Sequence, residues 1–212
     1  MSGGRIVALL GAESTGKTTL AHELAGALSA EGQDAVVVEE YLREFCAVHG
    51  RTPQRDEQRA IAAEQTRRIE AAAAAHAIVI ADTTALMIAV YSDLVFGDTS
   101  LYAEAEAAHA RCAATLLTAL DLPWQADSHQ RDGPHVREPV DAKVRAALGR
   151  AGSAYAIVSG VDRGRLAAAL AGVRRMLAAP AAARAAARWQ WHCERCGDPD
   201  CERHLLPQPP AP

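Results

Sequence analysis

The sequence lacks the composition of a nucleic-acid-binding or disulfide-bonded protein. Its 22 lysines and arginines are outnumbered by 26 aspartates and glutamates, which leaves a net charge of -4. No overall basic field is therefore present to attract nucleic acid. The five cysteines, three of them close to the C-terminus, do not have the pattern of a disulfide framework.

A long hydrophobic run is also missing. The alanine-rich stretch Ala71–Ala81 is interrupted by His76, whereas a membrane-spanning helix needs about 20 consecutive apolar residues. The apolar run that follows Arg5 is short and has no small-residue cleavage site, so we expect no signal peptide. These absences favour a cytoplasmic protein. With 212 residues and 50% hydrophobic content, the chain can bury a sizeable core without disulfides.

Residues 11–18 are the clearest motif in the chain. They read Gly-Ala-Glu-Ser-Thr-Gly-Lys-Thr, between an apolar run and a stretch of helical composition. Glycines let such a loop curl so that backbone N–H groups and a helix N-terminus point into one concavity, which suits a polyphosphate. The lysine then reaches the β- and γ-phosphates, and the hydroxyl after it holds Mg²⁺. We therefore predict a site for ATP and Mg²⁺ made by Gly11, Ala12, Glu13, Ser14, Thr15, Gly16, Lys17, Thr18 and Thr19.

Alternation of short apolar runs and helical segments predicts the fold class. Five runs are typical of buried parallel strands: Arg5–Leu10, Ala35–Val38, Ala77–Ala81, Ala114–Leu120 and Tyr155–Ser159. Helical composition lies between them at Lys17–Ala30, Leu42–His49, Gln54–His76, Ala85–Val95 and Val140–Arg150. The order indicates an α/β protein with three layers around a five-stranded parallel sheet.

Acidic residues follow the second and third apolar runs. Because ligands of such sheets gather beyond the carboxyl ends of the strands, we expect Glu39, Glu40 and Asp82 to face the phosphate loop. Asp82 has the position of a carboxylate that holds the metal, with catalytic base as the alternative. Glu40 is the candidate for the acceptor side, and Arg43 is a neighbouring anion or hydroxyl contact. The alternative for Glu39 and Glu40 is simple stabilisation of the next helix N-terminus.

The segment Asp121–Arg137 follows the fourth run and has the composition of a mobile loop. Its arginines Arg131 and Arg137 can close over the transferring phosphate, because guanidinium groups match phosphate oxygens. Trp124 stands out in a chain with only 4% aromatic residues, and its indole is a candidate platform for a heteroaromatic ring. The alternatives are a solvated arginine pair and a tryptophan that anchors the loop.

Taken together, these motifs give a specific resemblance across residues 1–170. Gly11–Thr19, Glu40–Phe45, Ala81–Thr83 and Asp121–Trp124, with Asp127 and Arg131, resemble the NadR-like nicotinamide riboside kinase family of P-loop ATPases. The resemblance implies the three-layer P-loop NTPase/kinase fold and transfer of the γ-phosphate of ATP to the 5'-hydroxyl of nicotinamide riboside.

By the same resemblance, Glu40 and Arg43 contact the acceptor, Asp82 lies on the metal side, Trp124 stacks on the nicotinamide ring, and Arg131 lies in a lid that closes over the site. We therefore predict Lys17, Glu40, Asp82 and Arg131 as the catalytic residues. Together with the loop arginine Arg137, the predicted contacts to the acceptor are Glu40, Arg43, Trp124 and Asp127. The chain departs from the family pattern after Trp124, where Gln125 stands in place of an acid, and the stretch Ser159–Arg163 has no tyrosine to cover the second face of the ring. Kinase chemistry tolerates these changes better than nicotinamide specificity does.

A second cluster lies near the C-terminus. Cys193, Cys196, Cys201 and His204 place four soft ligands within twelve residues, around a Gly-Asp-Pro turn. This set is typical of a closed structural Zn²⁺ site, for which His192 is an alternative ligand; reduced surface thiols or a redox pair are the competing interpretations. We therefore divide the chain into a kinase domain (1–180), an alanine-rich linker (181–188), a zinc segment (189–206) and a tail (207–212).

Three function classes are consistent with these features. The first is a kinase of nicotinamide riboside, with a small nucleoside as its partner and neither nucleic acid nor membrane. The second is a P-loop kinase of another small acceptor. The third is a nucleotide-dependent regulatory ATPase whose zinc-bearing tail recruits a partner. The sequence assigns no oligomeric state.

Overall fold

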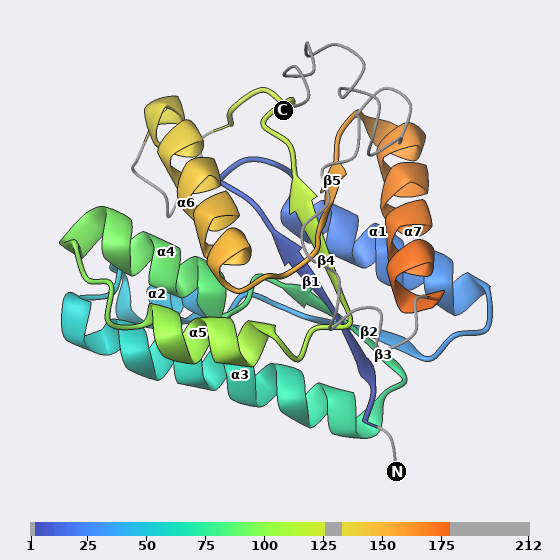
Figure 1. The fold of residues 1–212 in the computed structure, drawn as a ribbon, viewed down its shortest axis with the longest axis horizontal. Coiled ribbons are helices and arrows are strands. Elements are labelled where there is room, and N and C mark those ends of the chain that lie inside the picture. Colours follow the sequence, from blue (N-terminus) through green and yellow to red (C-terminus); the bar gives the residue numbers. More distant parts are fainter. Residues whose placement is uncertain (1–2, 126–132, 179–212) are drawn as a thin grey trace, which may run out of the picture.

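The computed structural model describes residues 3–125 and 133–178. Within them, five parallel strands form one sheet in the order β2-β3-β1-β4-β5 (Figure 1). The strands are β1 (Arg5–Leu10), β2 (Ala35–Val38), β3 (Ile78–Asp82), β4 (Ala114–Thr118) and β5 (Ala156–Val158). The predicted five-stranded parallel sheet is confirmed, although β3 begins and ends one residue later than predicted and β4 ends two residues earlier.

Helices cover both faces of this sheet. They are α1 (Lys17–Ala30), α2 (Tyr41–His49), α3 (Gln58–Ala75), α4 (Ala85–Phe96), α5 (Tyr102–His109), α6 (Arg137–Arg150) and α7 (Asp162–Ala178), with short 3-10 turns at Arg55–Glu57 and Pro134–Val136. Figure 1 shows α1 and α7 on one side of the sheet and the other helices on the opposite side. None of the helices in the described part of the chain is long and apolar enough to cross a membrane.

Alternation along the strands divides the core between the two faces. In β1, Val7 and Leu9 pack with α1 and α7, whereas Ala8 and Leu10 pack with α4 and α6. All five residues of β3 are buried. Burial on both faces explains why the strands are continuous apolar runs rather than alternating ones.

Two differences from the predicted helices have clear causes. Helix α6 begins at Arg137 rather than at Val140. Pro139 is tolerated in its first turn, because a backbone N–H at that position would have no acceptor within the helix. This start removes Arg137 from the predicted loop. Neither α5 nor α7 is among the predicted helices. The α5 sequence alternates alanine and glutamate and buries only Ala105 and His109, so it has no clear apolar face.

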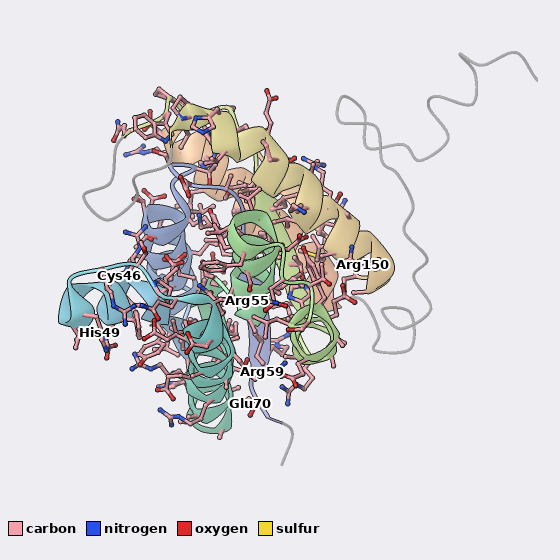
Figure 2. All side chains as sticks on the ribbon, turned by 90° about the vertical axis from the view of Figure 1, so that its left-hand side faces the viewer. Cys46, His49, Arg55, Arg59, Glu70 and Arg150 are labelled. Carbon is pink, nitrogen blue, oxygen red and sulfur yellow. The ribbon has the colours of Figure 1, made fainter. Side chains whose placement is uncertain are left out.

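Charged residues lie on the outer surfaces of these helices. Figure 2 shows Arg59 and Glu70 on α3 and Arg150 on α6. Arg59 of α3 pairs with Glu104 of α5, and Arg150 of α6 pairs with Glu106 of α5. Exposed pairs of this kind contribute about 0–1 kcal/mol each, so the stability of the fold rests mainly on the two apolar layers.

Candidate nucleotide site

The phosphate loop, residues Gly11–Thr18, joins β1 to the first residues of α1. Gly11 and Gly16 have φ values of 148° and 71°, which favour glycine. Gly16 is the N-cap of α1, and no side chain caps that end of the helix. The first N–H groups of α1 are therefore without a side-chain cap, at a helix end that attracts anions.

Packing beneath the loop fixes its path. The Thr15 and Thr118 hydroxyl oxygens lie 2.7 Å apart, and the Thr118 hydroxyl donates to the carbonyl oxygen of Leu10 at 3.1 Å. Gly11 lies directly against this pair, since a Cβ atom built there would stand 2.0 Å from Thr118 Oγ1. The loop is thus closely seated on the end of β4.

Replacing Gly11 with alanine should displace the phosphate loop from its position on β4. The added methyl group would clash with the Thr118 side chain, and an alanine rarely adopts the φ of 148° found at Gly11. We therefore expect a loss of at least about 2 kcal/mol in the free energy of unfolding and no detectable ATP binding. Thermal unfolding and calorimetric titration measure the two effects. The matched control is Gly26→Ala in the exposed interior of α1, where a Cβ meets nothing within 4 Å, and it should stabilise the chain slightly. Normal ATP binding by Gly11→Ala would contradict the packing argument.

Thr18 and Asp82 form an oxygen pair at the mouth of the loop. The Thr18 hydroxyl donates to Asp82 Oδ2 at 2.6 Å. Asp82 is only 1% exposed, and its other carboxylate oxygen is buried with no hydrogen-bond partner in the described structure. A buried oxygen without a partner is costly unless a ligand satisfies it, and oxygen ligands are those that Mg²⁺ prefers. These two residues therefore fit the predicted magnesium site.

Lys17 lies within the same cluster. Its Nζ atom donates to the carbonyl oxygen of Ala12 at 2.8 Å. Burial lowers the pKa of Lys17, and the nearby carboxylates of Glu40 and Asp82 act in the opposite direction. An ammonium group held in this way gains from the negative charge of a phosphate, because that charge restores the preference for the protonated form.

Glu40 stands at the N-cap of α2, near enough to Lys17 for their charges to interact. Its side chain is 10% exposed, and it accepts a hydrogen bond of 3.0 Å from Arg43 Nε. Burial raises the pKa of Glu40, the repulsion of Asp82 adds to this, and Lys17 and Arg43 oppose it. A carboxylate with a raised pKa is suited to proton transfer nearer neutral pH.

Glu39 does not join this cluster. The sequence predicts three carboxylates facing the loop, but Glu39 lies at the surface, where its side chain is 64% exposed and pairs with His22 at 3.0 Å. The reason is the alternation of side chains along an extended segment, which sends neighbouring residues to opposite faces.

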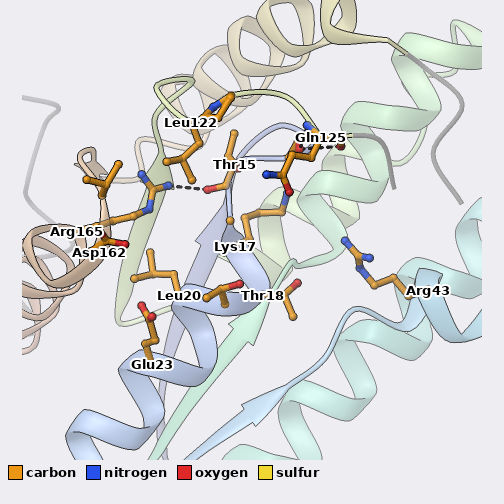
Figure 3. Close-up of a pocket in the computed structure, with 15 residues that line it drawn as sticks. Thr15, Lys17, Thr18, Leu20, Glu23, Arg43, Leu122, Gln125, Asp162 and Arg165 are labelled. Carbon is orange, nitrogen blue, oxygen red and sulfur yellow. Dashed lines mark hydrogen bonds between the residues drawn. The ribbon is translucent and has the colours of Figure 1, made fainter. Parts of the chain in front are cut away.

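A cavity of about 720 Å³ opens in front of the phosphate loop. Figure 3 shows Lys17 and Thr18 at its centre, Arg43 on one side, and Arg165 and Asp162 on the other. The full lining is Ser14, Thr15, Gly16, Lys17, Thr18, Thr19, Leu20, Glu23, Arg43, Leu122, Pro123, Gln125, Val161, Asp162 and Arg165. The cavity therefore extends from the phosphate loop along α1 to the segment between β5 and α7.

The segment after β4 forms part of this wall. Gln125 and Ser14 are joined by two hydrogen bonds, of 2.7 and 2.9 Å, between the Ser14 hydroxyl and the Gln125 backbone. Trp124 is half-buried, and among the described residues its neighbours Pro123 and Gln125 line the cavity while Trp124 does not. A role for Trp124 in ring stacking stays a prediction.

Arg137 lies behind the same segment. It is 8% exposed and donates from Nη1 to the carbonyl oxygen of Leu122 at 2.9 Å. Its contact in the structure is thus with the backbone that leads into the predicted lid, and a phosphate contact for Arg137 stays a prediction. Asp127 and Arg131 lie outside the described residues.

Arg165 and Gln65 are site residues that the sequence did not reveal. Arg165, on α7, is 5% exposed and donates to the Thr15 carbonyl oxygen at 2.6 Å and to the Gly160 carbonyl oxygen at 3.1 Å. It also pairs with Asp121, whose pKa is lowered by the Gly160 N–H and by Arg165 against the opposing effect of burial. Gln65 bonds to the segments that follow β2 and β3.

The zinc prediction has no structural test. Cys193, Cys196, Cys201 and His204, with the alternative ligand His192, lie outside the described residues. Within residues 3–125 and 133–178, no group of three or more His, Cys, Asp or Glu side chains is placed to hold a metal ion. The Zn²⁺ site stays a prediction.

The parallel sheet and its glycine-containing loop define a P-loop nucleotide-binding protein. A family model described as an AAA domain matches residues 6–165, well over half of the chain. The chain belongs to this AAA domain family. No curated protein matches its sequence significantly.

Two solved structures of NadR protein share the fold. One, in complex with NAD and AMP-PNP, is 22% identical with a TM-score of 0.66; the other, in complex with NR, is 21% identical with a TM-score of 0.67. Each alignment covers 84% of this chain, but only 50% and 52% of the respective NadR chains, so the chain spans about half their length. At this identity the likeness establishes a common fold.

Proposed function

We propose that this protein transfers the γ-phosphoryl group of ATP to the 5'-hydroxyl of nicotinamide riboside or a similar nucleoside. The observation that carries the proposal is the convergence of Lys17, Asp82 and Glu40 at the mouth of the phosphate loop. The two NadR structures, one holding AMP-PNP and the other NR, support the choice of donor and acceptor.

Each residue of the cluster has a role in such a transfer. The N–H groups at the start of α1 and the Lys17 ammonium hold the β- and γ-phosphates and stabilise the charge that develops on them. Thr18 and Asp82 would hold Mg²⁺, which when bound neutralises charge on the phosphate oxygens.

On the acceptor side, Glu40 orients the hydroxyl and accepts its proton, and Arg43 holds the Glu40 carboxylate in place. The low exposure of Glu40 supports this role, because a buried carboxylate keeps a fixed direction and a raised pKa. Arg131 and Arg137 remain the proposed contacts to the phosphate from the segment after β4. Asp127 remains a proposed contact to the nucleoside.

An acceptor panel tests the proposal. Purified protein is incubated with Mg-ATP and nicotinamide riboside, another nucleoside or no acceptor. ADP release is followed, and the mass of the product is measured by mass spectrometry. We expect ADP release that depends on nicotinamide riboside and a product one phosphate heavier. Preference for another nucleoside would assign the chain to a different kinase. Slow ADP release that no acceptor changes would favour the regulatory ATPase.

Trp124→Ala tests the contact to the acceptor ring. If the indole stacks on the ring, its loss should raise the acceptor KM about tenfold or more, because stacking on an aromatic side chain contributes about 1–3 kcal/mol. The KM for ATP should change little. Trp124→Phe keeps an aromatic face and should recover part of the affinity. Equal changes in the two KM values would remove the stacking role.

A further inference from the structure

Gln65 is a polar residue in an apolar stripe of α3. Ile61 and Ile69 lie one turn before and one turn after it, and all three face the protein interior. Gln65 is 0% exposed. Because an amide group is costly to bury unless it is hydrogen-bonded, its partners must account for its presence.

The Gln65 amide bonds to two separate segments of backbone. Its Oε1 atom accepts from the N–H of Tyr41 at 2.7 Å. Its Nε2 atom donates to the carbonyl oxygens of Glu39 at 3.3 Å and Thr83 at 3.2 Å. One side chain therefore connects the chain after β2 with the chain after β3.

These partners are the immediate neighbours of the two acidic residues of the site. Glu39 and Tyr41 flank Glu40, and Thr83 follows Asp82. Gln65 does not line the cavity in the described structure. It is thus placed to fix the backbone that carries both carboxylates without itself contacting a ligand.

The hydrogen bond from Gln65 to the Thr83 carbonyl oxygen also helps to hold a strained backbone conformation at Thr83. Thr83 has a φ of 75°, which is unusual for a β-branched residue and costs about 1–3 kcal/mol. Such a conformation persists only where its surroundings hold it. The Thr83 N–H donates to the Leu9 carbonyl oxygen at 3.1 Å, and Gln65 binds the Thr83 carbonyl oxygen from the other side.

We propose that Gln65 is a positioning residue for phosphoryl transfer, which sets Glu40 and Asp82 at their working separation across the phosphate loop. The inference rests on the proposed function. Its physical basis is that the three hydrogen bonds tie two strand ends to one helix, whereas the nucleotide-binding loop itself receives none of them. The loss of Gln65 should therefore affect turnover far more than ATP affinity.

Two variants of similar volume test this inference. Gln65→Met removes all three hydrogen bonds without adding charge. Gln65→Glu keeps an acceptor for the Tyr41 N–H, and because burial favours the neutral carboxyl group, its hydroxyl can still donate to one of the two carbonyl oxygens. It therefore removes fewer hydrogen bonds and is the milder test case if the methionine variant is unstable. We expect both to lower kcat, Gln65→Met by about 10²-fold, as a misplacement of about 1 Å does, with the KM for ATP rising several-fold at most.

Thr115→Val is the matched control. Thr115 is 3% exposed on β4 and its hydroxyl lies 3.0 Å from His109 Nε2, so the variant loses a buried hydrogen bond away from the cavity. It should lose stability but keep kcat. A loss of kcat in the Gln65 variants no larger than in Thr115→Val would overturn the inference, as would a loss matched by an equal rise in the KM for ATP.

A second readout separates this inference from the proposed function. Mn²⁺ is titrated into each variant with AMP-PNP present, and binding is followed by electron paramagnetic resonance, which needs no turnover. The Gln65 variants should bind Mn²⁺ several-fold more weakly than Thr115→Val, because Asp82 is displaced. If the wild-type protein transfers phosphate to no acceptor, the proposed function fails. The role of Gln65 is then decided by this titration, and equal Mn²⁺ affinity overturns it.

Discussion

Lys17→Ala should abolish phosphoryl transfer while leaving the fold intact. Lys17 lies at the centre of the cavity in Figure 3, and its Nζ atom donates to the Ala12 carbonyl oxygen of the phosphate loop. Removal of a single charge-stabilising donor in an active site commonly lowers kcat by about 10²-fold or more. Steady-state ADP release in the presence of the best acceptor measures the effect. Circular dichroism and thermal unfolding establish that the variant remains folded.

The chain offers a matched control in its only other lysine. Lys143 lies on α6 and pairs with Asp93 at 2.6 Å, away from the cavity. Lys143→Ala removes the same charge and should keep full activity. Retention of full activity by Lys17→Ala would refute the assignment of the phosphate loop to catalysis.

Glu40→Gln should produce the second large loss, and the loss should depend on pH. In the wild-type protein Glu40 must be ionised to accept a proton, and burial raises its pKa. Activity should therefore fall as the pH decreases through that raised pKa, at a higher pH than for an ordinary glutamate. Glutamine keeps the shape but cannot take the proton, so kcat should fall by about 10²- to 10⁴-fold and the acidic limb of the pH profile should disappear.

Glu39 supplies the control for Glu40. It is the preceding residue in the chain, carries the same side chain, and points to the surface beside His22. Glu39→Gln should leave both kcat and the pH profile unchanged. An acidic limb that survives in Glu40→Gln would assign the titration to a group other than Glu40.

The sequence predicts those features that depend on local pattern. The apolar runs identify the strands because parallel strands are buried on both faces, and the glycine spacing identifies the phosphate loop. The contact between Thr18 and Asp82 also follows from pattern, since both residues stand at predicted strand or helix ends. The matched AAA domain family covers the same region.

What the sequence does not reveal depends on contacts between distant residues. Arg165 reaches Thr15 across 150 positions, and nothing in its local sequence distinguishes it from a surface arginine. The sequence gives a weak indication of Gln65, because this polar residue stands between Ile61 and Ile69 on the interior face of a predicted helix. Its three hydrogen-bond partners belong to other segments, which the local pattern does not identify. Glu39 points outward because side chains alternate along the extended segment, and the position after a strand, on which its prediction depends, does not distinguish it from Glu40.

The central claim is that the loop at the start of α1 binds the triphosphate of ATP. Isothermal titration of AMP-PNP into the wild-type protein and into Lys17→Ala, with and without Mg²⁺, tests this claim most directly. The account predicts one nucleotide bound per chain, strengthened by Mg²⁺ and strongly weakened by the loss of Lys17. Absence of binding to the wild-type protein, or equal affinity in the two proteins, would contradict it.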